Sequence, residues 1–224
     1  MTAISFSLEP CAPGDHDGIE RLLDICFGLA RRTKTSYRLR EGEEAMAGLS
    51  FLARTDKVAL AGVISYWRVF IGEQAIPALL LGPLAVHPNL QGQGIGRALM
   101  KHTLALAKAR GERLVILVGD EPYYARVGFR EVPQGRLVMP GHVDPNRLLY
   151  LELVEGALKD AEGLVLSPSR LQQKRRGRAS ATLAVPHQAY EREQQGKRDQ
   201  RPEQREPFNL FDPVAVVGLK AKPA

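Results

Sequence analysis

Residues 84–97, with the sequence LAVHPNLQGQGIGR, combine residue types that are suited to binding phosphate. An apolar run ends at Val86, and Gly92, Gly94 and Gly96 precede an amphipathic stretch. A glycine-rich loop between a strand and a helix leaves backbone N–H groups unpaired beside the positive end of the helix dipole. The segment therefore predicts a site for a cofactor that carries phosphate groups.

The order of the glycines distinguishes among three nucleotide-binding loops. A dinucleotide-binding loop has the pattern G-x-G-x-x-G after the first strand, whereas this loop follows roughly the fourth predicted strand. A P-loop ends in Gly-Lys-Ser/Thr, and the segment 96–98 (Gly-Arg-Ala) lacks the hydroxyl that would bind Mg²⁺. Residues 91–96 (QGQGIG) instead fit the third pattern, Gln-x-x-Gly-x-Gly. A plain strand-to-helix turn is the alternative interpretation.

A second motif follows at residues 122–129, PYYARVGF. It places Tyr124 four residues before Gly128, and Phe129 comes next. A phenol with a pKa of about 10 keeps its proton at neutral pH and can donate it to a leaving group. Tyr124 is therefore a candidate general acid. The alternative is a packed aromatic residue, which is the expected role of Tyr123.

Together the two motifs resemble the GNAT superfamily of N-acetyltransferases, and the resemblance covers about residues 3–166. It implies acetyl-CoA as co-substrate and no metal. In the family, the strand before the loop splays from its neighbour, and its backbone pairs with the pantetheine arm. The glycine loop then holds the pyrophosphate through backbone amides. The implied cofactor-binding residues are Leu84, Ala85, Val86, Gln91, Gly92, Gln93, Gly94, Ile95, Gly96 and Arg97.

The resemblance implies transfer of an acetyl group to a primary amine of a small molecule or protein, by direct attack in a ternary complex. A backbone N–H would polarise the thioester carbonyl, and Tyr124 would protonate the leaving thiolate. The general base stays open among Glu73, Asp120 and Glu121, acting through water, and an amine of lowered pKa that needs no base. His87 is expected to be structural. The alternative function is a non-enzymatic acyl-CoA-binding regulatory module. Neither the acceptor nor the acyl-chain length follows from the sequence.

Predicted strands alternate with helices, which indicates an α/β class. The resemblance implies a mixed, mostly antiparallel sheet with helices on both faces and splayed central strands. The apolar run 75–86 predicts a central strand, with a bulge or splay near Pro83 because proline cannot donate to a ladder. A helix is expected over residues 96–110 and a buried strand over 114–118. The polar stretch 31–44, which contains Tyr37, either lines a substrate mouth or is a solvated connection; the second interpretation is favoured.

Charge divides the chain into two predicted domains. Residues 1–166 carry 19 Lys/Arg and 19 Asp/Glu, and form the expected acetyltransferase domain. Residues 167–224 carry 12 Lys/Arg and 6 Asp/Glu in a basic, Gln/Arg/Pro-rich extension that is expected to be largely disordered or loosely helical. Its basic run 174–178 has few aromatic neighbours, so a solvated extension is favoured over nucleic-acid binding.

The two cysteines, Cys11 and Cys26, have no metal-ligand spacing, which indicates a reduced, cytoplasmic setting. No apolar run approaches the roughly 20 residues that span a bilayer, so no membrane partner is expected. The start of the sequence lacks the pattern of a signal peptide. The expected partner is an amine substrate of unknown identity, and a homodimer stays open.

Overall fold

The structure is a computed structural model that describes residues 4–56 and 58–183. Its strands are β1 (Ser7–Pro10), β2 (Phe51–Arg54), β3 (Gly62–Ile71), β4 (Ile76–Val86), β5 (Leu114–Val118), β6 (Arg130–Glu131), β7 (Leu137–Val138), β8 (Leu148–Glu152) and β9 (Gly163–Leu166). Its α-helices are α1 (His16–Phe27), α2 (Thr35–Arg38), α3 (Ile95–Ala109), α4 (Glu121–Tyr124) and α5 (Pro168–Leu183). Short 3₁₀ turns include η2 (Leu29–Thr33) and η4 (Ala125–Val127).

The strands of the described residues form one mixed, mostly antiparallel sheet. Its main path runs β1-β2-β3-β4-β5-β8-β6, and β9 pairs with both β3 and β7. On this main path the strands pair antiparallel except for β4 and β5, which are parallel. The fold class expected from the sequence is therefore confirmed.

The central strands β4 and β5 diverge. They pair only at Leu79 with Val115 and at Leu80 with Ile116, although β4 continues to Val86. The register of β4 against β3 also shifts between Leu81 and Leu84, where Gly82 and Pro83 form a bulge. The predicted bulge or splay near residue 83 is confirmed, and it opens the sheet along one edge of β4.

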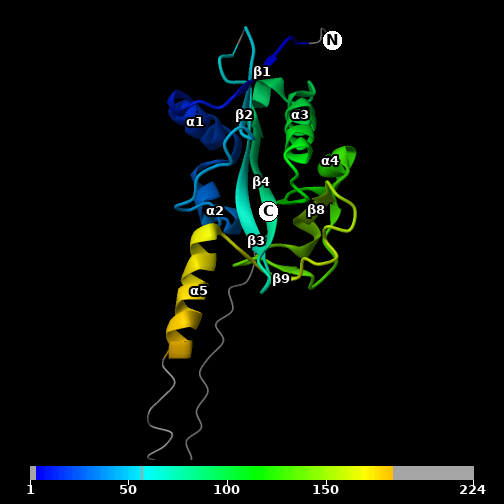
Figure 1. Ribbon diagram of the computed structural model, residues 1–224. Coiled ribbons are helices and arrows are strands. Elements are labelled where there is room, and N and C mark those ends of the chain that lie inside the picture. The colour runs from blue at the N-terminus through cyan, green and yellow to red at the C-terminus, as the bar shows by residue number, and fades with distance from the viewer. Residues whose placement is uncertain (1–3, 57, 184–224) are drawn as a thin grey trace, which may run out of the picture. The chain divides into compact units, whose positions relative to one another are not determined.

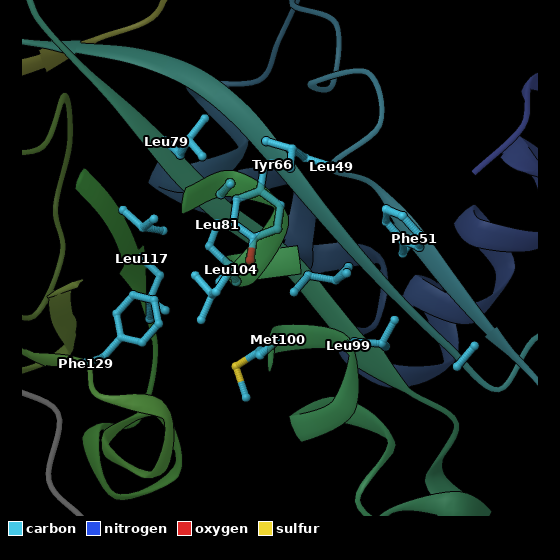
Figure 2. Packing of buried hydrophobic residues seen from close by; sticks show 14 of the residues in the cluster. Leu49, Phe51, Tyr66, Leu79, Leu81, Leu99, Met100, Leu104, Leu117 and Phe129 are labelled. Carbon is cyan, nitrogen blue, oxygen red and sulfur yellow. The ribbon is translucent and has the colours of Figure 1, made fainter. Parts of the chain in front are cut away.

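Helices cover both faces of the sheet (Figure 1). On the α3 face, Leu99, Met100 and Leu104 pack with Tyr66 of β3 and with Leu79 and Leu81 of β4, as Figure 2 shows. Alternation along β4 places Ala78 and Leu80 on the opposite face, where they pack with Leu39 after α2. Ala85 on that face packs with Leu22 and Leu23 of α1.

Helix α3 matches its prediction to within one residue at each end. Its buried positions are Ile95, Gly96, Leu99, Met100, Thr103, Leu104 and Ala107, which form one apolar stripe. Gly94 caps the N-terminus in a left-handed conformation, with φ of 85°. Gly111 follows the helix with φ of 80°, the conformation that terminates many helices.

The first part of the basic extension forms α5 and contacts the domain. Ser167 and Leu171 are buried, and the backbone N–H of Ser169 donates to Glu43 Oε1 at 2.9 Å. Lys174, in the basic run, pairs with Glu73 at 2.5 Å. The boundary after residue 166 stays a prediction, and the expectations for residues 184–224 lie outside the described residues. None of the described helices is long and apolar enough to cross a bilayer.

Candidate functional site

A cleft of about 1000 Å³ lies where β4 and β5 diverge. It brings together the glycine loop, Tyr124 and the end of β4, which are far apart in the sequence. Among the predicted site residues, those that line it are Leu84, Val86, Gln91, Gly92, Gln93, Gly94, Ile95, Gly96, Arg97 and Tyr124. Ala85 does not line the cleft, because its side chain packs beneath α1 on the opposite face of the strand.

The loop glycines meet two different requirements. Gly92 and Gly94 have φ of 77° and 85°, a region that side-chain-bearing residues rarely adopt. Gly96 is helical, but a Cβ atom there would lie 2.2 Å from the Tyr123 hydroxyl oxygen. The two motifs are therefore in direct contact, since Tyr123 packs on the backbone of Gly96.

The loop is also tied to the end of β4. The Gln91 side-chain amide donates to the Val86 carbonyl oxygen at 3.3 Å, and the Cys26 thiol donates to the same oxygen at 3.4 Å. These contacts fix the loop at the carboxyl end of the strand. The N-terminus of α3, a helix of 15 residues, then faces the cleft with its positive dipole end.

Tyr124 is held by aromatic and backbone packing. Its ring forms edge contacts with Tyr123 and Phe129, with centroid distances of 5.1 and 5.9 Å. It also lies so close to Gly119 that a Cβ atom there would be 2.2 Å from the ring. Burial raises the pKa of Tyr124, and nearby Tyr123 and Asp120 raise it further, against a lowering effect of Arg147. The phenol therefore keeps its proton at neutral pH.

The cleft is strongly cationic. Its described lining contains Arg31, Lys34, Arg40, Arg97, Arg126 and Arg147, and Asp120 is the sole carboxylate there. Arg31 is neutralised by Glu20 and Asp24, and Arg147 pairs with Asp120 at 3.2 Å. No ion pair within the described residues engages Lys34, Arg40, Arg97 or Arg126, so the cleft suits a ligand that carries several negative charges.

The candidate bases separate in the structure. Asp120 lines the cleft, whereas Glu73, Glu121 and His87 are not among its described lining residues. Glu73 pairs with Lys174 of α5, and His87 Nδ1 accepts a hydrogen bond from the N–H of Asn89 at 3.4 Å. The described residues contain no group of three His, Cys, Asp or Glu side chains placed to hold a metal ion.

The favoured interpretation of residues 31–44 as a solvated connection is wrong. Arg31 and Leu39 are buried, and Tyr37 and Arg40 line the cleft. The stretch has a polar composition, yet one of its arginines is buried. An ion-pair network between α1 and η2 neutralises that arginine, and composition alone does not reveal such a network. The three-residue spacing of Tyr37 and Arg40, which places them on one side of a helical turn, is the signal that could have been used.

Comparisons with known proteins concern the same region. A family model described as an acetyltransferase (GNAT) domain matches residues 47–131, which contain β4, β5, the loop and both motifs. The uncharacterized N-acetyltransferase YjhQ of Escherichia coli K12 is 31% identical over 130 residues, covering 58% of this chain and 72% of YjhQ. YhbS of the same strain, also an uncharacterized N-acetyltransferase, is 29% identical over 153 residues, covering 68% and 90%. The crystal structure of E. coli YhbS in complex with CoA has a TM-score of 0.63 at 25% identity, covering 77% of this chain and 94% of YhbS.

Proposed function

Because this chain belongs to the GNAT superfamily of N-acetyltransferases, we propose that its cleft binds acetyl-CoA and delivers the acetyl group to a primary amine. The observation that carries this proposal is the cleft itself. A single cavity joins the phosphate-binding loop, the diverging edge of β4 and Tyr124. The CoA bound to the YhbS crystal structure supports the same assignment.

The proposed pose follows from the shape and charge of the cleft. The pyrophosphate lies against the backbone N–H groups of residues 91–97, where the start of α3 and Arg97 supply positive potential. The pantetheine arm extends along the edge of β4 at Leu84, Ala85 and Val86, which β5 leaves unpaired. Its amides add to the sheet like a further strand. The thioester then lies near the bulge and Tyr124.

The proposed reaction is direct. The neutral amine attacks the thioester carbon, a backbone N–H of β4 polarises the carbonyl, and Tyr124 donates its proton to the departing thiolate. Asp120 is the carboxylate available in the described cleft to accept a proton from the amine through water. An amine of lowered pKa would need no such base. A cytoplasmic location and a homodimer stay predictions.

Substitution of Gly94 tests the proposal. Gly94→Asp places a carboxylate beside the proposed pyrophosphate, and repulsion should weaken CoA binding by about 100-fold or more. Gly94→Asn has nearly the same shape and tolerates the left-handed backbone of this position, so its effect should be less than about tenfold. Isothermal titration calorimetry measures both affinities.

Gly111→Asp is the matched control, because Gly111 also has a positive φ but follows the far end of α3. It should leave CoA affinity unchanged. Equal CoA affinity of Gly94→Asp and the unmodified protein would refute the proposed site. Acetyl-CoA binding without release of the CoA thiol in the presence of any amine would instead support the acyl-CoA-binding module.

A further inference from the structure

The cleft reaches both faces of the sheet. The glycine loop and Arg97 lie at the start of α3, on one face. Arg40 directly follows Leu39, which packs with Leu80 on the opposite face. The proposed cofactor phosphates occupy the α3 side, so the second side is left for the acceptor.

Arg40 packs against the bulge of β4, close to where β4 separates from β5. Its guanidinium carbon lies 4.6 Å from the ring centre of Tyr37 and 6.0 Å from that of Trp67. The absence of a side chain at Gly82, in the β4 bulge, allows the close approach of Arg40 Nη2, which lies 3.3 Å from the position of a Cβ atom there. The Trp67 indole N–H donates to the Gly82 carbonyl oxygen at 2.7 Å, which fixes the indole at the same bulge.

Tyr37 and Trp67 contact the guanidinium of Arg40, but no carboxylate within the described residues neutralises its charge. Its Nε atom is buried without a hydrogen-bond partner, and no described carboxylate forms an ion pair with it. Burial lowers the pKa of Arg40 to about 10, so it is still cationic at neutral pH. A half-buried cation without a carboxylate partner is costly, and an anionic ligand would supply the missing counter-charge.

Two carboxylates of α1 form ion pairs with Arg31 and not with Arg40. Arg31 is 1% exposed and pairs with Glu20 and Asp24, at 2.7 and 2.8 Å. Its Nη1 donates to the Tyr37 hydroxyl at 2.8 Å, which orients the ring on which Arg40 stacks. This network holds Arg40 in place but supplies no counter-charge to it.

The remaining cations divide between the two ligands. Arg97 in α3 and Arg126 in η4 lie on the side where CoA presents its phosphates. Lys34 and Arg40 flank α2 and Leu39, and Leu39 packs on the face opposite α3, where CoA under the proposed pose offers no charge. These two cations are therefore available to a second anion.

We propose that the acceptor is an amine that also carries an anionic group, a carboxylate or a phosphate, which Arg40 binds with its planar fork while Lys34 contributes at the rim. The inference rests on the proposed function, because it assigns the α3 side to acetyl-CoA. A guanidinium matches two oxygens of either group at once, and the fixed position of Arg40 would orient the amine toward the thioester. Neutral amines and polycations are poor acceptors under this proposal.

Matched amines test the preference. β-Alanine is compared with β-alaninamide, and O-phosphoethanolamine with ethanolamine, by measuring kcat/KM from CoA thiol release. We expect the anionic member of at least one pair to be preferred by about 10- to 100-fold. The two pairs distinguish a carboxylate from a phosphate.

Variants assign the preference to Arg40. In Arg40→Gln the ratio of anionic to neutral kcat/KM should fall to near one while CoA still binds. Arg32→Gln removes the same charge from an exposed residue outside the described lining of the cleft and should keep the ratio. Equal use of both members of each pair by the unmodified enzyme, or a preference that survives Arg40→Gln, would overturn the proposal.

A binding measurement covers the case in which no amine of the panel is acetylated. Trp67 is the one tryptophan of the chain and lies beside Arg40, so its fluorescence reports an anion bound there. Inorganic phosphate and acetate are titrated into the CoA-saturated protein at constant ionic strength, against chloride. A saturable change that Arg40→Gln abolishes and Arg32→Gln retains supports the proposal, and no change with either anion overturns it. Failure of CoA to bind would instead overturn the proposed function.

Discussion

At the scale of single residues, Tyr124 is the side chain on which the proposed chemistry depends. Tyr124→Phe removes the proton donor but keeps the ring that packs on Phe129, so kcat should fall by about 100-fold. CoA affinity should change little. Because burial raises the pKa of Tyr124, the loss should be the same at pH 7 and pH 9. Thiol-release kinetics and calorimetry measure the two quantities.

Tyr150→Phe is the control for this prediction. Tyr150 lies in β8, is buried in the cluster on the face opposite α3 and is not among the described lining residues of the cleft. Its loss of a hydroxyl should leave kcat unchanged. If Tyr124→Phe retains full kcat at both pH values, leaving-group protonation does not depend on this residue.

Sequence motifs and single residues differed in how far they could be predicted. Tyr124 and the loop glycines follow from local spacing, since a glycine loop and a Tyr-x-x-x-Gly-Phe element are both contiguous patterns. Arg40 could not be predicted, because its burial depends on Tyr37, Trp67 and Gly82, and the last two lie 27 residues or more along the chain. Composition shows a basic stretch and does not show which of its cations lack a partner.

At the scale of elements, α3 is joined to β3 by a buried polar contact. The hydroxyls of Tyr66 and Thr103 lie 2.8 Å apart, and Thr103 also donates to the Leu99 carbonyl oxygen at 2.8 Å. Both side chains are 0% exposed. Tyr66 must therefore donate to Thr103, and it has no other hydrogen-bond partner among the described residues.

Thr103→Val should lower the free energy of unfolding by about 2 kcal/mol, because it leaves the Tyr66 hydroxyl buried and unpaired. The double variant Thr103→Val/Tyr66→Phe removes both polar groups and should be more stable than Thr103→Val alone. Urea unfolding at unchanged m-value measures each variant. Strictly additive losses in the double variant would contradict this account of the contact.

Long apolar elements could be predicted, whereas the short strands β7 and β9 could not. β4 and β5 are continuous apolar runs, and α3 has a regular apolar stripe, so their patterns indicate them directly. β7 has two residues and β9 four, too few for a periodic pattern. β9 pairs with β7 and with β3, and no local sequence pattern predicts this tertiary arrangement.

At the scale of the molecule, one crossover explains where the site lies. Two parallel strands need a crossover connection, and α3 supplies it between β4 and β5. The helix must therefore begin at the carboxyl end of β4, which is where the two strands diverge. Its N-terminus, the free strand edge and the gap in the sheet consequently coincide, as at other ligand sites of α/β sheets.

The extent of the folded domain is the last prediction. A chain that ends after Leu166 loses Leu171, 8% exposed, and the hydrogen bond from Ser169 to Glu43, whereas one that ends after Leu183 keeps both. Burial of one leucine contributes about 2 kcal/mol, so the shorter chain should melt roughly 5 °C lower by calorimetry at pH 7.

Burial opposes ionisation of Glu43, but its hydrogen bonds with Ser169 and Ser167 lower the pKa overall. The stabilisation that comes from the lowered pKa of Glu43 is complete above its unfolded pKa of about 4.3. It is lost as the pH falls through the lower folded pKa. The difference in melting temperature between the two chains should therefore shrink below about pH 4. Equal melting temperatures at pH 7 would instead place the boundary at residue 166.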